Sequence, residues 1–154
     1  MPSAKYCRVF PLNTFPVYRY VVVFSRRNGQ WLFSRHKARQ TWETQGGHIE
    51  PGETPLEAAQ RELYEESGAL SYAIRPVFDY WAGTDMESSV GAVFLAEIDD
   101  LGPLPDSEMA EVRAFDTLPD NVTYPAITPM LFEELKALIK RAAASSAGLE
   151  GVSG

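Results

Sequence analysis

Residues 54–57 place the strongest local constraint on the fold of this chain. The run Thr54-Pro55-Leu56-Glu57 is a capping box, in which the threonine hydroxyl accepts from the backbone N–H of the glutamate and the glutamate reaches back. Proline suits the first helical position because its missing N–H would have no partner there. A helix is therefore predicted to begin at about residue 55, and Gly68 is placed to end it.

The predicted helix has an apolar side and an acidic side. Leu56, Ala59 and Leu63 follow helical spacing and are expected to form a narrow buried stripe. Beside them lie three glutamates at positions i, i+3 and i+4: Glu62, Glu65 and Glu66. Like charges at these spacings cost a few tenths of a kcal/mol per pair, roughly, which a bound cation would compensate. Carboxylate oxygens suit Mg²⁺ or Mn²⁺, whereas the alternative is a solvated acidic face.

The glutamates belong to a longer pattern that makes a solvated face a weak explanation. The spacing is G-x5-E-x7-R-E-U-x-E-E-x-G-U, where U is an aliphatic residue, and the matching residues are Gly47, Glu53, Arg61, Glu62, Leu63, Glu65, Glu66 and Gly68. In this pattern the chain strongly resembles the Nudix hydrolase family, over roughly residues 15–140. At the last U, Ala69 replaces the usual Ile, Leu or Val, and Leu70 is expected to fill its packing role.

The resemblance implies an α/β fold, an αβα sandwich around a mixed β-sheet. It also implies hydrolysis of a nucleoside diphosphate linked to another group, by attack of water on phosphorus with the help of a divalent metal. Mg²⁺ is the expected ion, with Mn²⁺ as the alternative. Residue by residue, the resemblance assigns metal binding to the carbonyl of Gly46 and to the carboxylates of Glu53, Glu62, Glu65 and Glu66.

The general base is left open by the resemblance, because the family draws it either from the helix or from a distant loop. Glu66 and Glu62 rank first as catalytic candidates. The alternative bases lie outside the helix, where an exposed loop glutamate is the competing interpretation: Glu108, Glu111 and Glu87.

Arg61 is a further catalytic candidate. It stands in an i, i+4 ladder with Glu57 and Glu65, which favours a role in holding the metal-binding carboxylates over contact with substrate. Arg35, with Lys37 and Arg39 nearby, could bind terminal phosphates, and a solvated hairpin end is the equal alternative.

Two further segments bear on the substrate. Residues 42–47, Trp-Glu-Thr-Gln-Gly-Gly, resemble the Trp-Glu-x-Pro-Gly-Gly lead-in of the MutT-type branch, with Gln45 replacing proline and putting the rigidity of the loop in question. Residues 118–121 resemble the segment in which that branch places a base-reading asparagine. Asn121 is therefore a candidate purine contact, with a turn-forming asparagine as the alternative. Phe78, Tyr80 and Trp81 alternate near a strand end and could supply a wall on which a base stacks, whereas aromatic core packing is the competing interpretation for at least one face.

The function expected from these features is Mg²⁺-dependent hydrolysis of a nucleoside triphosphate, with an oxidised dGTP-like purine favoured, giving nucleoside monophosphate and pyrophosphate. The alternatives are removal of pyrophosphate from RNA 5′ ends and cleavage of ADP-ribose or a nucleotide sugar. A non-catalytic ligand-sensing module belongs to a different class and would be expected to lack some of the carboxylates. The expected partner is a small nucleotide, and the chain is expected to be a monomer or homodimer.

Composition limits the remaining possibilities. With 154 residues, 45 % of them apolar, the chain is expected to form one domain over residues 1–141, followed by a frayed helix end and mobile tail at 142–154. A net charge of −7 argues against nucleic-acid or anionic-membrane binding. Cys7 is the only cysteine, so no intrachain disulfide forms and a cytoplasmic location is expected. No apolar run reaches the length of a membrane span.

Pattern and turn residues predict the remaining elements. Strands are expected at residues 17–24, 30–35, 72–81, 90–98 and 110–115. The run Val21-Val22-Val23-Phe24 is continuously apolar, which is typical of a strand buried on both faces. Thr128-Pro129 repeats the N-cap and proline pattern and opens a second helix. Its apolar face is predicted to contain Met130, Leu131, Leu135, Leu138 and Ile139.

Overall fold

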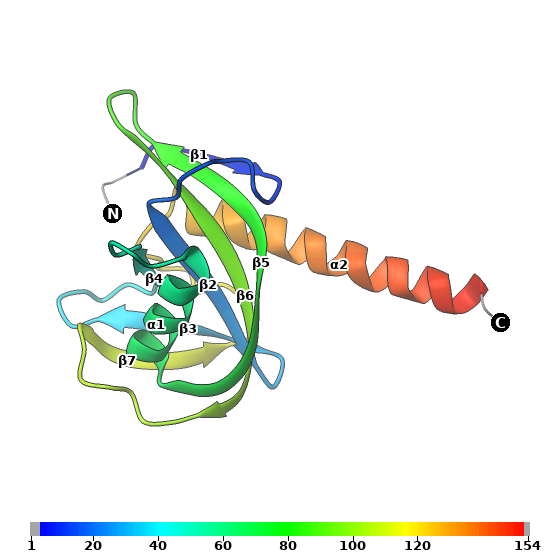
Figure 1. Cartoon of the computed structure of the whole chain (residues 1–154). Helices are drawn as coiled ribbons and strands as arrows, with labels where there is room; N and C mark the ends of the chain where they lie inside the picture. Colours follow the sequence, from blue (N-terminus) through cyan, green and yellow to red (C-terminus); the bar gives the residue numbers. More distant parts are fainter. Residues whose placement is uncertain (1–3, 153–154) are drawn as a thin grey trace.

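The computed structural model describes residues 4–152 of the chain, and the side chains of residues 4–146. Its strands form a seven-stranded sheet in the order β1-β5-β6-β2-β3-β7, with β4 paired to β2. The elements are β1 (Tyr6–Phe10), β2 (Tyr20–Arg27), β3 (Gln30–His36), β4 (Gln45–His48), α1 (Pro55–Ser67), β5 (Ala69–Gly83), β6 (Ser88–Leu101), β7 (Met109–Phe115) and α2 (Thr128–Val152) (Figure 1). Because β2 and β6 are parallel while the other pairs are antiparallel, the sheet is mixed, as predicted.

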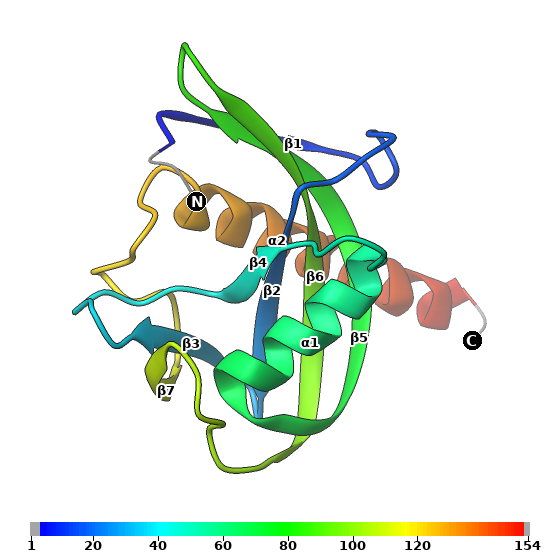
Figure 2. The ribbon, with the colours of Figure 1, turned by 60° about the vertical axis from the view of Figure 1, so that its left-hand side comes forward.

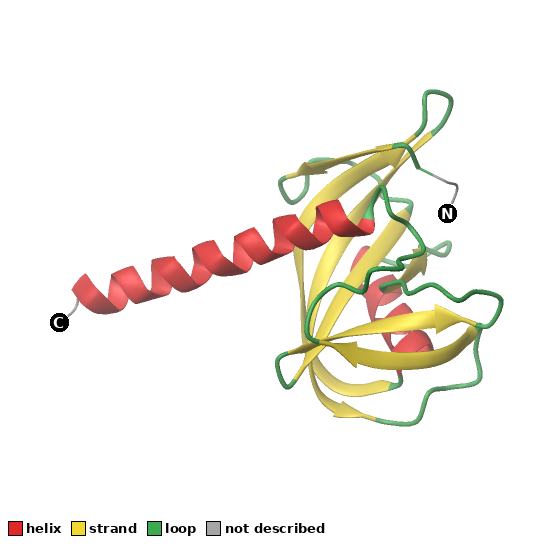
Figure 3. Cartoon of the chain, turned by 180° about the vertical axis from the view of Figure 1, so that it is seen from behind, coloured by secondary structure: helices red, strands yellow, loops and turns green. Residues whose placement is uncertain are grey.

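The two helices lie on opposite faces of the sheet, which confirms the predicted αβα sandwich. Figure 2 shows α1 in front of β2 and β6, whereas Figure 3 shows α2 on the other face. The α1 side buries Val21 and Val23 with Leu63, and the α2 side buries Val22 and Phe24 with helix residues such as Leu135. Alternate residues of β2 thus enter two different cores.

Helix α1 begins and ends where the sequence predicted. The Thr54 side chain accepts from the backbone N–H of Glu57 at 3.1 Å, and the Glu57 carboxylate accepts from the backbone N–H of Thr54 at 3.0 Å. Gly68 ends the helix with φ 83°, a conformation that costs glycine little.

The buried stripe of α1 differs from the prediction at one position. Ala58, Ala59 and Leu63 are fully buried, but Leu56 is 42 % exposed. Ala58 takes the place expected of Leu56 in the core on this side of the sheet. The stripe is therefore built mainly from small residues, which allow the helix to approach the sheet closely.

The residues after α1 also correct an expectation. Ala69 is buried in the α1-side core, whereas Leu70 is 57 % exposed, so Leu70 does not take over the packing role of the aliphatic position. Ala69 already belongs to β5, where side chains alternate between the two faces, and the next residue must therefore point outward.

The strand predictions located most elements but misplaced their ends. β2 starts at Tyr20, not at Val17, which is 74 % exposed. β5 and β6 are longer than predicted because they pair along almost their whole length as a hairpin. β1 was not predicted at all. It is short and only partly buried, and it is fixed by antiparallel pairing with Trp81 and its neighbours on β5.

Helix α2 extends through most of the segment that was expected to form a tail from residue 142. The helix runs continuously from Thr128 to Val152, beyond the edge of the sheet (Figure 3). Residues 142–146 are exposed, and the segment from residue 142 is rich in alanine, the residue with the highest helix propensity, which favours continuation of the helix. The mobility of this segment stays a prediction, and residues 153 and 154 of the expected tail lie outside the described part of the chain.

The first turn of α2 also differs from the expectation. Thr128 lies inside this turn, not at its cap, because its N–H already bonds to the carbonyl of Tyr124. Met130 is 47 % exposed, and Phe132 takes the core position, packing its ring 5.1 Å from that of Trp31. Neither helix in residues 4–152 is long and apolar enough to cross a membrane.

Candidate active site

Two adjacent glycines bring strand β4 against the acidic side of α1. A Cβ atom on Gly47 would lie 2.7 Å from Oε1 of Glu62, so only glycine lets this carboxylate lie against the strand. Gly46 has φ 150°, and a Cβ there would overlap the carbonyl oxygen of Val21 on the paired strand β2. The glycine pair therefore sets the distance between the loop backbone and the carboxylates of the helix.

Glu66 is the carboxylate most tightly bound to this strand. Its Oε1 accepts a hydrogen bond from the backbone N–H of Gly46 at 2.7 Å. Burial raises the pKa of Glu66 to about 9, and the negative charges of Glu62, Glu43 and Glu108 add to the rise against the opposing hydrogen bond from Gly46. Among the described residues, the charged groups that act on the Glu66 carboxylate are thus other carboxylates.

Glu62 lies beside Glu66 in a similar setting. Burial raises its pKa, and the negative charge of Glu65 contributes to the rise, whereas the hydrogen bond from Arg61 lowers the pKa. The Arg61 guanidinium donates to Glu62 at 2.8 Å, so Glu62 is partly neutralised while Glu66 is not.

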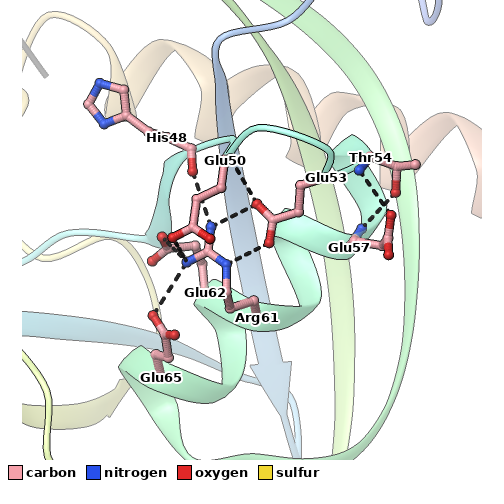
Figure 4. Close-up of polar contacts among 8 residues, drawn as sticks. All are labelled: His48, Glu50, Glu53, Thr54, Glu57, Arg61, Glu62 and Glu65. Carbon is pink, nitrogen blue, oxygen red and sulfur yellow. Dashed lines mark hydrogen bonds and ion pairs between the residues drawn. The ribbon is translucent and has the colours of Figure 1, made fainter.

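Arg61 lies among the carboxylates and joins the helix to the loop before it (Figure 4). Its guanidinium donates to both oxygens of Glu53 at 2.6 and 2.9 Å, to Glu65 at 3.4 Å and to the carbonyl of His48 at 3.2 Å. This pairing lowers the pKa of Glu53 to about 2. Glu57 takes no part, because its side chain closes the capping box. The positioning role expected for Arg61 fits these contacts.

The carboxylates of α1 and the carbonyl of Gly46 are oxygen ligands that suit a hard divalent cation, although they are not arranged around one common position. Within residues 4–152, no three histidine, cysteine, aspartate or glutamate side chains lie close enough together to enclose a metal ion. Glu62 and Glu66 are nevertheless neighbouring carboxylates whose pKa values are raised, first by burial and then by nearby negative charges. Oxygen ligands of this kind favour Mg²⁺ or Mn²⁺.

A cleft opens next to the glycine pair, between β4 and the start of α2. It has a volume of about 80 Å³. Its lining combines the strand backbone with aromatic, acidic and hydroxyl side chains from several segments: Tyr20, Glu43, Thr44, Gly46, Gly47, His48, Tyr124, Ile127 and Thr128 among them. The cleft is thus a cavity that adjoins the acidic helix and offers groups for recognising a ligand.

Three of the lining residues were not singled out from the sequence. Glu43 is only 8 % exposed, and its carboxylate pairs with the guanidinium of Arg39 at 3.4 Å. The ring of Tyr20 lies 4.4 Å from that of His48, and Tyr124 lies in the segment before α2. Position next to the glycine pair could have pointed to Glu43, but Tyr20 and Tyr124 carry no pattern that separates them from core aromatics.

Asn121 binds to the backbone in this structure. Its side-chain amide donates to the carbonyl of Gln40 at 2.9 Å, and its own carbonyl accepts from the backbone N–H of Trp42. Asn121 does not belong to the lining of the cleft. The predicted purine contact stays a prediction that requires the amide to leave Gln40.

The two other predicted substrate contacts also lie away from the cleft. Arg35 donates to Glu111 at 3.3 Å and to the carbonyl of Arg39 at 3.2 Å, so its guanidinium is engaged. Trp81 lines a separate groove of about 460 Å³ beside β1. Phe78 and Tyr80, which precede it on β5, are buried in the α2-side core.

The alternative bases differ in their surroundings. Glu108 is near enough to raise the pKa of Glu66, and its carboxylate lies 3.6 Å from the ring of His36. Glu111 is paired with Arg113 and Arg35, which lower its pKa. Glu87 lies at the exposed tip of the β5–β6 hairpin. Of the three, Glu108 is the one that the structure brings toward the acidic side of α1.

Gln45, which replaces the proline of the MutT-type lead-in, is held in place by side-chain hydrogen bonds. It is fully buried, and its side chain accepts from the hydroxyl of Ser25 at 2.5 Å and donates to that of Ser34 at 3.0 Å. Ser34 in turn donates to the carbonyl of Glu66 at 2.8 Å. Side-chain hydrogen bonds therefore fix the entrance of the loop and connect β4, β3 and the end of α1.

Comparison with known proteins agrees with this fold and site. Residues 14–128 match the NUDIX domain. Because the match covers well over half of the 154 residues, the chain belongs to the Nudix family.

Two curated relatives of this chain are named for different activities. The "Putative 8-oxo-dGTP diphosphatase YtkD" of Bacillus subtilis is 32 % identical over 106 residues, which are 68 % of this chain and 66 % of that protein. The RNA pyrophosphohydrolase of Tolumonas auensis is 45 % identical over 47 residues, which are 30 % of this chain and 27 % of that protein. This chain therefore spans slightly less than two thirds of the first relative and about a quarter of the second.

Solved structures support the fold. A point mutant of the Bacillus subtilis pyrophosphohydrolase BsRppH superposes with a TM-score of 0.71 at 22 % identity, covering 94 % of this chain and 95 % of that one. A NUDIX hydrolase from Nitrosomonas europaea superposes with a TM-score of 0.56 at 25 % identity, covering 73 % and 68 %. Likeness at this level of identity is evidence for the fold.

Proposed function

We propose that this chain hydrolyses a phosphoanhydride bond of a nucleoside triphosphate and releases nucleoside monophosphate and pyrophosphate. The observation that carries the proposal is the pair Glu62 and Glu66, two half-buried carboxylates with raised pKa that face the backbone of Gly46 and Gly47. Such a pair favours a bound cation, and it lies next to a cleft lined by aromatic, acidic and hydroxyl side chains.

Glu62, Glu66 and the carbonyl of Gly46 would hold a divalent cation, with Glu65 and Glu53 in support. When bound, the cation supplies positive charge to the phosphate oxygens and makes water a stronger acid. Arg61 keeps Glu53 and Glu62 in place, and the backbone N–H of Gly46 orients Glu66. A carboxylate at this position accepts the proton as the water oxygen bonds to phosphorus and pyrophosphate leaves.

We infer that Glu66 is the first candidate for this base and Glu62 the second. Glu66 has the greater claim because it has no arginine partner among the described side chains, so no existing ion pair lowers its basicity. Glu108 is the reserve candidate, since its charge already acts on Glu66.

The experiment that tests the function is a hydrolysis screen with Mg²⁺ and with Mn²⁺, comparing the wild type with Glu66→Gln. The panel contains oxidised and normal dNTPs, ADP-ribose, dinucleoside polyphosphates and nucleotide sugars. A triphosphate should lead, and the variant should lower kcat by orders of magnitude while keeping the circular dichroism spectrum. Glu133→Gln, an exposed change on α2, is the matched control and should keep full activity. A panel led by ADP-ribose would overturn the triphosphate assignment.

A purine is favoured as the base, in keeping with the name of the YtkD relative and with Asn121. If Asn121 reads the base, Asn121→Ala should lower kcat/KM by roughly tenfold, and more for the preferred purine than for a pyrimidine. An equal loss of kcat/KM for all bases would mean that Asn121 does not read the base and that its side chain serves only to bind the backbone carbonyl of Gln40.

Removal of pyrophosphate from an RNA 5′ end is the second candidate, because the curated relatives with short matches include RNA pyrophosphohydrolases. The net charge of −7 weighs against a long nucleic-acid contact. A triphosphorylated oligonucleotide in the same panel separates the two substrates: a kcat/KM above that of every free triphosphate would favour RNA.

A further inference from the structure

A buried hydroxyl group without a hydrogen-bond partner lies behind the cleft. Tyr80 on β5 is fully buried, and among the described residues its Oη has no partner. An unpaired hydroxyl in an apolar surrounding destabilises the folded state, and nearly all such groups in native proteins find a partner. The hydroxyl of Tyr80 is therefore a candidate for contact with a ligand.

The ring of Tyr80 is directed toward the cleft. Tyr80 pairs in register with Gly91 on β6, and a Cβ on Gly91 would overlap Cε1 of the ring and lie 2.7 Å from its Cζ. The same Cβ would lie 2.9 Å from the carbonyl oxygen of Tyr20, the residue across from Gly91 on β2. The outer end of the ring thus crosses β6 toward Tyr20, and glycine at position 91 leaves it room.

The groups around the hydroxyl belong partly to the cleft wall. Burial raises the pKa of Tyr80, and the ionisable groups of Cys7, Tyr20 and Tyr124 contribute to the rise. Tyr20 and Tyr124 also line the cleft. Tyr20 and Tyr124 therefore belong both to the cleft lining and to the groups that act on the Tyr80 hydroxyl, which remains a neutral donor and acceptor.

The size of the cleft indicates that this wall must move when a ligand binds. About 80 Å³ is far below the 300–1,000 Å³, roughly, of ordinary ligand pockets. Tyr20 is fixed within β2, whereas Tyr124 lies in the irregular segment between β7 and α2 and is only half-buried. Displacement of Tyr124 is the smaller change, and it would widen the cleft toward the hydroxyl of Tyr80.

We propose that Tyr80 is a specificity-determining residue of this cleft, and that its hydroxyl hydrogen-bonds to the base of the bound nucleotide once Tyr124 moves aside. The inference rests on the proposed nucleoside triphosphate function and adds a residue to its recognition site. A tyrosine hydroxyl has one donor and free lone pairs, so it distinguishes the carbonyl, amino and ring-nitrogen positions by which bases differ. The bound nucleotide then supplies the hydrogen-bond partner that the Tyr80 hydroxyl lacks among the described residues.

The test is Tyr80→Phe, which removes the hydroxyl and keeps the ring. The kcat/KM of the variant is measured for ATP, GTP, CTP, UTP and 8-oxo-dGTP, together with its thermal unfolding. The preferred base should lose about tenfold in kcat/KM and the poorest base less than about twofold, while Tm stays unchanged or rises because an unpaired group is removed. Tyr72→Phe, on the same strand but packed on the α1-side core, is the matched control and should change neither quantity.

Two results would overturn the proposal. One is an equal loss of kcat/KM for every base, and the other is a lower Tm with unchanged base preference, which would make the hydroxyl a structural group. If the wild type hydrolyses none of the five nucleotides, the proposed function fails. In that case, binding of the same nucleotides to the wild type and to Tyr80→Phe is measured by calorimetry in EDTA, and a loss of affinity that depends on the base supports the role of Tyr80. If the wild type binds none of them, both proposals are overturned.

Discussion

The guanidinium of Arg61 donates to both carboxylate oxygens of Glu53, eight residues earlier in the chain, at 2.6 and 2.9 Å. The two residues lie on different elements, Arg61 on α1 and Glu53 in the loop that follows β4. Glu53 also accepts from the backbone N–H of Glu50 at 2.9 Å. This bidentate pair therefore helps to fix the loop relative to the carboxylates of the helix, together with the bond from Arg61 to the carbonyl of His48.

Arg61→Lys should keep the charge and lose this geometry, because an ammonium group cannot bind both oxygens of Glu53 in the same planar arrangement. We expect the concentration of Mg²⁺ needed for half-maximal activity to rise by roughly 10- to 100-fold, the scale of losses when a group supporting a metal ligand is changed. Arg141→Lys, at an exposed ion pair of α2, is the control and should leave the Mg²⁺ dependence unchanged. The same dependence for Arg61→Lys as for the wild type would contradict the positioning role.

The stability of the metal-free protein should depend on pH through two glutamates with opposite shifts. The pKa of Glu53 falls from 4.5 to about 2, so its contribution is present above pH 4.5 and disappears as the pH falls toward 2. The pKa of Glu66 rises from 4.5 to about 9, so ionisation opposes folding increasingly as the pH rises from 4.5 to 9.

Melting curves in EDTA measure this dependence directly. Tm of the wild type should decline between about pH 5 and pH 9, and Glu66→Gln should flatten the decline because glutamine does not ionise. Glu133→Gln should retain the wild-type curve. A Glu66→Gln curve parallel to that of the wild type would mean that Glu66 ionises normally in the folded protein.

Alanine at the two adjacent glycines should give different defects. At Gly46 the new Cβ overlaps the backbone oxygen of Val21, which can move only with β2, so Gly46→Ala should lower Tm strongly. At Gly47 the Cβ meets the end of the Glu62 side chain at 2.7 Å, which can rotate away, so Gly47→Ala should fold and lose activity. Thermal unfolding and kcat for both variants separate the cases, and equal loss of Tm would refute the distinction.

Thr54→Ala should cost about 1 kcal/mol in the free energy of unfolding, because it removes the side-chain acceptor for the N–H of Glu57. Thr54→Ser keeps the hydroxyl and should remain within a few tenths of a kcal/mol, roughly, of the wild type. Urea unfolding of the three proteins gives the comparison. Alanine and serine variants of equal stability would show that the capping box contributes little to this helix.

The helix α1 could be predicted from the sequence because its determinants are local. A hydroxyl, a proline and a glutamate within four residues define its start, and Gly68 defines its end. The continuous helix through the second half of α2 was not predicted because its small and polar residues were interpreted as a frayed helix end and a mobile tail, although alanine favours a helix without any packing partner. β1 was missed because its five residues form a strand only through pairing with β5.

The acidic side of the candidate site could be predicted for the same reason, since one helix carries its three glutamates. The cleft could not, because Tyr20, Glu43 and Tyr124 come from distant segments and meet only in the folded chain. Trp81, predicted to stack on a base, lines the groove beside β1 and not the cleft, because it stands at the end of β5 that pairs with that strand. The roles of these residues in binding stay predictions.

The alternation of β2 between two cores has a consequence for how the molecule can open. Val21 belongs to the core under α1 and Val22 to the core under α2, and both pair with the glycines of β4. Detaching β4 from β2 therefore disturbs both halves of the interior at once. Unfolding of this region should be cooperative with that of the whole protein, so the carboxylates and the glycine backbone that face them keep their alignment until the molecule itself melts.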